Sequence, residues 1–142
     1  MQASPDDPSG VSLELAPEAL SVGRARAAVT DLARRVGAEP DAVALAVSEA
    51  VGNSVVHAFR GRDHGTISVC ATTDGQALVV VVADDGIGML PDLESPGLGL
   101  GTSLISQMAS EARFQSSDAG TTVTMSFSLA SAHDRAVATA DD

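Results

Sequence analysis

The sequence predicts an α+β protein, a two-layer sandwich in which helices cover one face of a mixed, mainly antiparallel sheet. Two observations carry this prediction. Strand-length segments, some alternating with period two and one continuously apolar, are interspersed with two long segments of helical period. The expected order is strand, two helices, hairpin, loop, helix and hairpin, an arrangement typical of helices packed on one side of a sheet.

The first half of the chain supplies the predicted strand and helix pair. Residues 11–15 alternate with period two, as a half-buried strand does. A helix is expected over about 17–36, with Gly37 as its C-terminal stop. Its apolar positions are Leu20, Ala27, Ala28, Val29, Leu32 and Val36.

A second helix is expected from Pro40, a residue that suits the first turn, to about Phe59. A core-facing stripe is predicted on one side of it. That stripe consists of Val43, Val47, Ala50, Val51, Ser54 and Ala58.

A hairpin follows a turn at 61–65. Its strands are expected at about 66–73 and 77–84, joined by the turn signal Asp74-Gly75. The second strand is apolar on both faces, which predicts a central place in the sheet.

The last part of the chain predicts a loop, a short helix and a second hairpin. The loop covers 85–98 and the helix runs from about 100 to 110. The hairpin strands are expected at about 112–117 and 121–129. We expect residues 1–10 and 131–142 to be flexible tails around one domain at 11–130.

Composition narrows the classes of function. The chain has 142 residues, enough for one core. It contains three Phe and neither Trp nor Tyr, so the core is expected to consist of Val, Leu, Ile and Ala. The same shortage of aromatic residues disfavours recognition of nucleic-acid bases by stacking on several rings. A net charge of -11 disfavours direct binding to nucleic acid or anionic membranes. The sequence has no apolar run near the roughly 20 residues of a membrane span, and no signal-peptide pattern. These features predict a cytoplasmic protein, with Cys70 as a small core residue.

Three polar segments of the sequence are candidates for a catalytic or ligand-binding site. In the first, Glu49, Asn53 and His57 are spaced four apart on the second predicted helix, which places them in one band. The Asn oxygen suits a Mg²⁺ shell, and a Glu one turn earlier can accept a proton from a hydroxyl. The alternative interpretation is a solvated helix edge. His57 either lies near phosphates or packs at that edge.

The second candidate element follows the apolar strand. Asp84 stands at the strand end beside Gly86 and Gly88, where its carboxylate can accept a hydrogen bond from an exocyclic amine such as adenine N6. Glycines let the backbone approach a base closely. An ordinary acidic turn at a strand end explains the same pattern.

The third candidate element is a glycine loop that runs directly into the predicted helix. Gly97, Gly99 and Gly101 alternate with Leu98 and Leu100, and Thr102 follows. Exposed backbone N–H groups and a helix N-terminus favour phosphate. A flexible hinge is the alternative, and the loop is not a Walker A motif because the chain contains no Lys.

The three elements together resemble one known superfamily. Glu49–Asn53 resembles the N box of the GHKL (Bergerat-fold) ATPases, Asp84–Gly88 their DxGxG box, and Gly97–Gly101 their GxGxG box. Gly120–Thr122 is similar to the late glycine-threonine turn that closes the site. The resemblance covers about 11–129. Within the superfamily, Leu45–Phe59 and Gly97–Ile105 resemble the anti-sigma-factor serine/threonine protein kinases of bacterial partner-switching systems.

This resemblance implies roles for particular residues. Glu49 is expected to be the general base, Asn53 to bind Mg²⁺, Asp84 to hold adenine, and Thr121 to support the adenine side. The nucleotide pocket is expected to be shaped by Gly86, Gly88, Gly97, Gly99, Leu100, Gly101 and Thr102. The implied reaction is γ-phosphoryl transfer from Mg-ATP. Its implied partners are a STAS-domain anti-sigma-factor antagonist, a sigma factor and a second copy of the chain.

Some residues depart from the family pattern. The loop 89–96 carries no Arg or Lys to meet developing phosphoryl charge, so Mg²⁺, backbone amides, or an Arg such as Arg60 or Arg62 must do so. Thr102 and Ser103 stand where many relatives have Leu-Pro, and Gly52 weakens its helix by up to about 1 kcal/mol relative to Ala. A non-catalytic, ATP-gated anti-sigma binding module is therefore the alternative to an active kinase.

Overall fold

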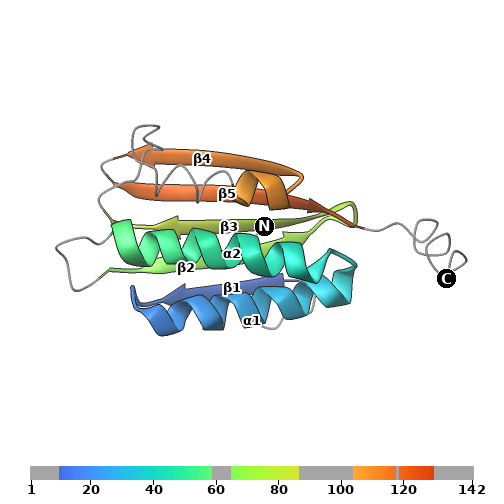
Figure 1. Cartoon of the computed structure of the whole chain (residues 1–142), viewed down its shortest axis with the longest axis horizontal. Coiled ribbons are helices and arrows are strands. Elements are labelled where there is room, and N and C mark those ends of the chain that lie inside the picture. The colour runs from blue at the N-terminus through green and yellow to red at the C-terminus, as the bar shows by residue number, and fades with distance from the viewer. Residues whose placement is uncertain (1–9, 59–64, 87–103, 118, 130–142) are drawn as a thin grey trace, which may run out of the picture.

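The computed structural model describes residues 10–58, 65–86, 104–117 and 119–129 of the chain. Their elements form a sheet with helices packed in front of it (Figure 1). The elements are β1 (Gly10–Leu15), α1 (Ala19–Val36), α2 (Pro40–Asn53), η1 (Ser54–Ala58), β2 (Ile67–Thr73), β3 (Ala77–Asp84), β4 (Glu111–Ser117) and β5 (Gly120–Ser128). Residues 104–108 are also helical. The predicted order of elements is confirmed for these residues.

The sheet has the strand order β1-β2-β3-β5-β4, so β3 is central, as its two apolar faces predicted. All four strand pairings are antiparallel. The α+β sandwich with helices on one face is therefore confirmed. Its described strands contain no parallel pair, and in this respect the expected mixed sheet is wrong. The reason is that β4, which runs in the same direction as β3, lies on the far side of β5 and pairs with β5 instead of with β3.

The two long helices lie side by side in front of β1, β2 and β3 (Figure 1). α1 ends at Gly37, which has a φ of 93° and donates its N–H to Ala33 O at 3.0 Å. A left-handed residue at this position favours glycine, so the predicted stop is confirmed. Pro40 opens α2, and the preceding Glu39 accepts a hydrogen bond from Asp41 N at 3.3 Å.

The second predicted helix changes type before its end. α2 finishes at Asn53, and η1 continues the chain as one wide π-helical turn. Phe59, the predicted end, lies outside the described residues. π-Turns are rare and are often found at functional sites. The change of helix type falls directly after one of the candidate site residues.

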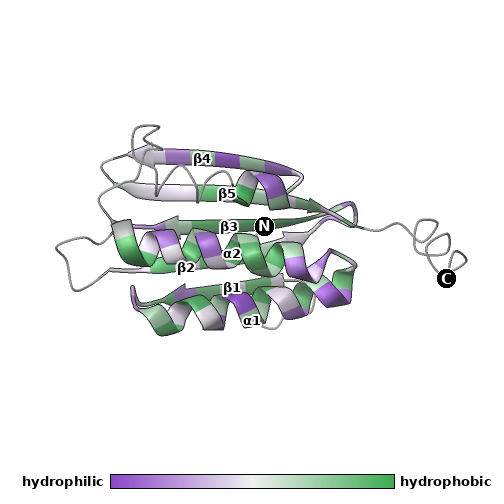
Figure 2. Cartoon of the chain, viewed as in Figure 1, coloured by the Kyte–Doolittle hydropathy of each residue, from purple (hydrophilic) through white to green (hydrophobic). Residues whose placement is uncertain are grey.

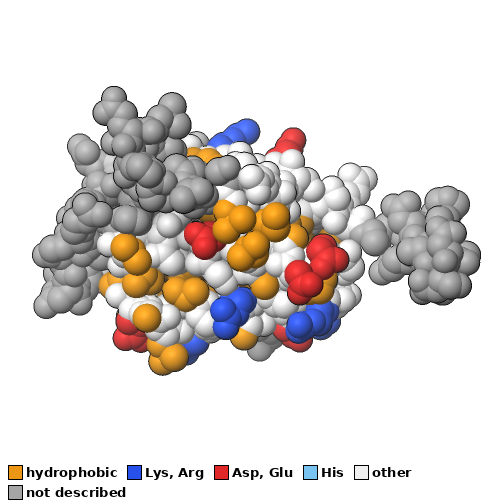
Figure 3. Space-filling view, in the orientation of Figure 1, with side chains coloured by type: hydrophobic (Ala, Val, Ile, Leu, Met, Phe, Trp, Pro, Cys, Tyr) orange, Lys and Arg blue, Asp and Glu red, His pale blue; other side chains and the backbone are white. Residues whose placement is uncertain are grey.

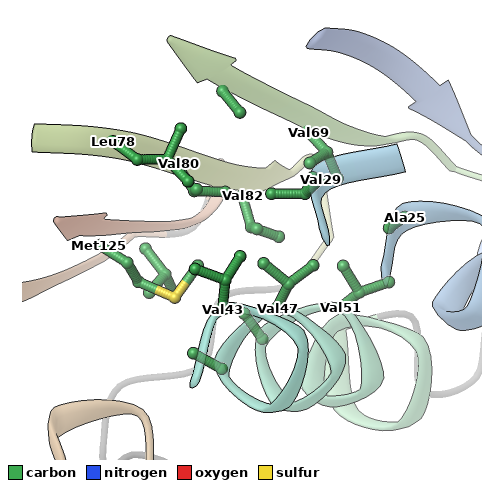
Figure 4. Packing of buried hydrophobic residues seen from close by; sticks show 14 of the residues in the cluster. Ala25, Val29, Val43, Val47, Val51, Val69, Leu78, Val80, Val82 and Met125 are labelled. Carbon is green, nitrogen blue, oxygen red and sulfur yellow. The ribbon is translucent and has the colours of Figure 1, made fainter. Parts of the chain in front are cut away.

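The core lies between the helices and the sheet. Val43, Val47 and Val51, spaced four apart on α2, point toward Val80 and Val82 of β3 (Figure 4). Hydrophobic colour is concentrated on β3 and hydrophilic colour runs along β4, an edge strand with no buried residue (Figure 2). The expected Val, Leu, Ile and Ala core is confirmed, with Met125 and Phe127 added from β5.

Two details of the predicted burial are wrong. Leu20 is 70% exposed and Ala27 is exposed, because α1 turns Ala25, Val29 and Leu32 toward the sheet instead. Together with Leu45 and Val56, Leu20 is one of the large hydrophobic side chains exposed in the described structure. From the helix side, hydrophobic groups lie in separate patches between charged groups of both signs (Figure 3).

Cys70 is exposed and is not a core residue. Successive side chains of a strand point to opposite faces. Its neighbours Val69 and Ala71 are buried under the helices, so Cys70 lies on the other face, 3.8 Å from Ser12 Oγ.

In the described ranges, no helix combines the length and the apolar character needed to cross a membrane.

Candidate functional site

Asp84 occupies the last core-facing position of the central strand. Along β3 every second residue is buried, and the series Leu78, Val80 and Val82 continues to Asp84, which is 8% exposed. Alternation along a strand therefore turns the carboxylate toward the helix layer. A buried carboxylate must be hydrogen-bonded, since its desolvation is otherwise costly.

Three donors surround the Asp84 carboxylate. Ser54 Oγ donates to Oδ2 at 2.7 Å. The backbone N–H groups of Gly86 and Thr121 donate to Oδ1 at 3.0 Å and 3.2 Å. Thr121 lies directly opposite Asp84 in the antiparallel pair of β3 and β5. The carboxylate thus joins the end of the helix α2, the turn after β3 and the start of β5.

Glycine is required at position 120 because the backbone there lies very close to that of Asp84. Its φ is 136°, a left-handed conformation, and a Cβ placed on it would lie 1.9 Å from the Asp84 carbonyl oxygen. Only glycine tolerates both conditions. Next to it, the hydroxyls of Thr121 and Ser116 lie 3.3 Å apart. The glycine-threonine pattern found in the sequence therefore has a steric basis.

The neighbouring aspartate has a different role. Asp85 is exposed, and its Oδ1 accepts a hydrogen bond from Thr66 N at 2.9 Å. Its own N–H donates to Thr66 O at 3.3 Å. Asp85 thus fastens the turn to the start of β2, which leaves Asp84 as the carboxylate held at the helix layer.

The polar band of α2 ends directly before Ser54, the residue that bonds to this carboxylate. Glu49 and Asn53 are one turn apart and both are partly buried, so a fully solvated helix edge is not what the structure shows. Asn53 directly precedes Ser54, whose bond to Asp84 fixes this end of the helix against β3. At Gly52, a Cβ would meet no heavy atom within 4 Å, so the described structure gives no steric reason for glycine there.

Gly86, the first glycine of the DxGxG pattern, is buried and donates to Asp84. The other expected nucleotide-binding residues lie outside the described residues. They are Gly88, Gly97, Gly99, Leu100, Gly101 and Thr102. The loop 89–96, Arg60 and Arg62 also lie outside them, as does the side chain of His57.

The residues present fit an adenine nucleotide and a magnesium ion. A carboxylate offers about four acceptor positions, so Asp84, with its three donors, keeps one for an exocyclic amine. Among the described residues, no group of three His, Cys, Asp or Glu could enclose a metal ion. That finding is compatible with Mg²⁺ bound through one amide oxygen such as Asn53, because Mg²⁺ keeps several waters.

A hollow lies elsewhere on the sheet. It is lined by Glu111, Ala112, Arg113, Thr124 and Ser126 of β4 and β5. On β5, Thr124 and Ser126 alternate with the buried residues Val123 and Met125, so they lie on the face of the sheet turned away from the helices. Glu111 and Arg113 pair with Ser126 and Thr124 and therefore lie on the same face. The hollow is therefore separate from Asp84.

Residues 14–127 match the family described as histidine kinase-like ATPase domain. Since this match covers most of the chain, the protein belongs to that family, the GHKL ATPases. The chain is similar to an anti-sigma F factor of Clostridium acetobutylicum, with 35% identity over 43% of this chain and 51% of the relative. It is also similar to the serine-protein kinase RsbW of Listeria monocytogenes, with 38% identity over 66% of this chain and 59% of the relative.

The chain thus spans between half and three-fifths of the length of these relatives. Among solved structures, it is similar to the RsbU and RsbW domains of a Mycobacterium tuberculosis protein, with a TM-score of 0.66 and 23% identity over 84% of this chain and 32% of that one. The histidine kinase domain of an Erythrobacter litoralis blue-light activated kinase gives a TM-score of 0.59 at 23% identity, over 84% of this chain and 63% of that one. At these identities the likeness establishes the fold.

One residue of the site was missed from the sequence. Ser54 was predicted as a member of the apolar stripe of the second helix and is indeed buried, at 3% exposure, but its hydroxyl bonds to Asp84. The signal was present, because a serine within a stripe of valines and alanines needs a hydrogen-bond partner when buried. The identity of that partner, 30 residues away, required the fold.

Proposed function

We propose that this chain binds Mg-ATP and transfers the γ-phosphoryl group to a serine or threonine of a STAS-domain anti-sigma-factor antagonist. The observation that carries the proposal is the Asp84 carboxylate, held by Ser54, Gly86 and Thr121 at the end of the central strand. The helix fixed to it carries Glu49 and Asn53. Membership of the histidine kinase-like ATPase family supports ATP as the nucleotide.

Each side chain has a proposed role. Asp84 accepts a hydrogen bond from the exocyclic amine of adenine, and Thr121 supports the same side of the base. Asn53 offers an amide oxygen as a Mg²⁺ ligand. Bound Mg-ATP supplies the phosphoryl group and the cationic charge that catalysis of this transfer relies on.

Glu49 is proposed as the general base that accepts the proton of the attacking hydroxyl. Its position one turn before Asn53 places a carboxylate on the same side of the helix as the proposed metal ligand. Backbone groups of the glycine loop, from Gly97 to Thr102, are proposed to surround the phosphates. Positioning by these residues supplies most of the expected rate acceleration.

The Glu49→Gln variant tests this function. Removal of a general base lowers a rate by about 10²-fold or more, so we expect transfer from ATP to a candidate STAS-domain protein to be lost. The affinity for Mg-ATP should stay near that of the wild type, because Gln is isosteric. Glu39→Gln, at the other end of the same helix, is the matched control, since a Gln oxygen can still accept from Asp41 N. Transfer by Glu49→Gln at the wild-type rate would contradict the assignment of the base.

We further propose that the chain sequesters a sigma factor, which implies a cytoplasmic location, and that it acts as a homodimer. The similarity of the chain to proteins named anti-sigma F factor and serine-protein kinase RsbW supports a sigma-factor partner. Co-elution of the protein with a candidate sigma factor in size-exclusion chromatography tests the first point, and the mass of the free protein measured by light scattering tests the second.

A non-catalytic, ATP-gated binding module is the second candidate. It is favoured by the loop 89–96, which contains no Arg or Lys to meet phosphoryl charge. This candidate predicts that a STAS-domain partner incubated with the protein and Mg-ATP keeps its intact mass. A gain of one phosphoryl group by that partner excludes it.

A further inference from the structure

Ser54 is a buried hydroxyl that links two parts of the proposed site. It is 3% exposed, and it is the first residue of η1, directly after Asn53. Its Oγ donates to Asp84 Oδ2 at 2.7 Å across a separation of 30 residues. Serine and threonine hydroxyls in helices often bond to the carbonyl four residues earlier, as Ser48 Oγ does to Ala44 O at 2.7 Å. Ser54 instead directs its hydroxyl out of the helix.

The two oxygens of Asp84 are held differently. Oδ1 accepts two backbone N–H groups, from Gly86 and Thr121, whose places are set by the strand pairing and the turn. Oδ2 accepts only the Ser54 hydroxyl among the described residues. The terminal torsion of an aspartate is intrinsically broad. The orientation of Oδ2, and of its remaining acceptor position, therefore depends on Ser54.

We propose that Ser54 is a positioning residue for base recognition, resting on the proposed function of Asp84 as the acceptor for the exocyclic amine. By fixing Oδ2, Ser54 directs the remaining acceptor position of the carboxylate toward a donor at position 6 of a purine. Because Ser54 follows Asn53 directly, the same bond fixes the end of the helix that carries the proposed metal ligand. Selectivity for an amino purine thus depends on a residue that need not contact the base.

A purely structural role makes a different prediction. If the Ser54–Asp84 bond only fastens the helix to the sheet, its loss weakens binding of every purine nucleotide by the same factor. If Ser54 positions Asp84, its loss weakens ATP more than a nucleotide without the amino group. The ratio of two dissociation constants therefore separates these roles, because a general loss of affinity cancels in it.

The experiment compares Mg-ATP with Mg-purine riboside triphosphate, which lacks the 6-amino group, by isothermal titration calorimetry. A hydrogen bond to a charged group corresponds to roughly a 10- to 100-fold preference of the wild type for ATP. We expect Ser54→Ala to lose about tenfold of this preference. Ser54→Thr, which keeps the hydroxyl, should restore the preference. Ser48→Ala should leave it unchanged, because the Ser48 hydroxyl bonds to Ala44 O within the helix.

The outcomes are distinct. An unchanged ratio in a folded Ser54→Ala protein overturns this inference and leaves the proposed function standing. A wild type that binds both nucleotides equally also overturns it, since the amine is then not recognised. A folded wild type that binds neither nucleotide overturns the proposed function as well. If Ser54→Ala does not fold, Ser54→Cys replaces it in the experiment. A cysteine side chain is close to serine in volume but is a weaker hydrogen-bond donor, so the preference for ATP should again fall.

Discussion

The central strand β3 has an aspartate and a glycine at each end, and the two ends differ in what holds them. Before the strand, the exposed Asp74 accepts hydrogen bonds from Gln76 N at 2.8 Å and Ala77 N at 3.0 Å, and Gly75 has a φ of 91°. At the last position of the strand, the buried Asp84 accepts hydrogen bonds from Ser54 and Thr121, which are 30 and 37 residues away. One end is a local turn and the other joins distant parts of the fold.

The difference shows how a single sequence pattern serves two purposes. An Asp whose bonds go to N–H groups two and three residues later closes a turn, which is a common use of Asp in loops. At the other end, the local bond to Gly86 is also present, but the long-range donors bury the carboxylate and direct it toward the helix layer. A candidate for ligand recognition is therefore distinguished by its distant partners.

The largest contrast in stability is expected between Gly75 and Gly120, two positive-φ glycines that lie near opposite ends of β3. Gly120→Ala forces a Cβ to within 1.9 Å of the Asp84 carbonyl, so the strands must separate, and we expect a loss of at least about 3 kcal/mol in the free energy of unfolding. Gly75→Ala meets no atom within 4 Å and suffers only backbone strain, about 1 kcal/mol. Urea denaturation of both variants measures the difference. Equal losses would contradict the close approach at Gly120.

An intermediate contrast is expected between the stability losses that follow replacement of Asp84 and of Asp74 by Asn at neutral pH. Asp84→Asn replaces an acceptor oxygen with an NH₂ group among three donors, and we expect it to cost about 2 kcal/mol. Asp74→Asn keeps an acceptor for the turn, and asparagine is favoured in such turns, so only a small loss is expected. Thermal unfolding of the two variants tests this. A larger loss for Asp74→Asn would reverse the roles assigned to the two ends.

The smallest effect is expected in the pH dependence of folding stability at Asp74. The N–H groups of Gln76 and Ala77 hold the pKa of Asp74 below its ordinary value. A depressed folded-state pKa contributes stability that is present above the unfolded value and is lost as the pH falls through the folded one. The stability difference between wild type and Asp74→Asn should therefore shrink below about pH 4. A carboxyl titration by NMR that gives an ordinary pKa for Asp74 would contradict this.

Most of the fold follows from local patterns. The valine run of β3 predicted its central place, and the Asp74-Gly75 turn and Gly37 predicted a hairpin and a helix end that the structure contains. These features are decided by period and by backbone conformation within a few residues. The exposure of Cys70 and Leu20 was not predicted, because it depends on strand register and on the rotation of α1 against the sheet.

The candidate site was predicted in part. Asp84, Glu49 and Asn53 were found from their motifs, and Asp84 is now seen with its donors. The bond from Ser54 and the steric need for Gly120 were not predicted, since both depend on the packing of segments distant in sequence. The roles of the glycine loop residues, from Gly97 to Thr102, stay predictions.

The central claim is that the carboxylate at the buried end of β3 recognises an adenine nucleotide. Calorimetric titration of Mg-ATP into the wild type, Asp84→Asn and Asp74→Asn tests it most directly. We expect the wild type and Asp74→Asn to bind with similar affinity, and folded Asp84→Asn to lose binding by about 10-fold or more. Equal binding by all three proteins, or no binding by the folded wild type, would contradict the account.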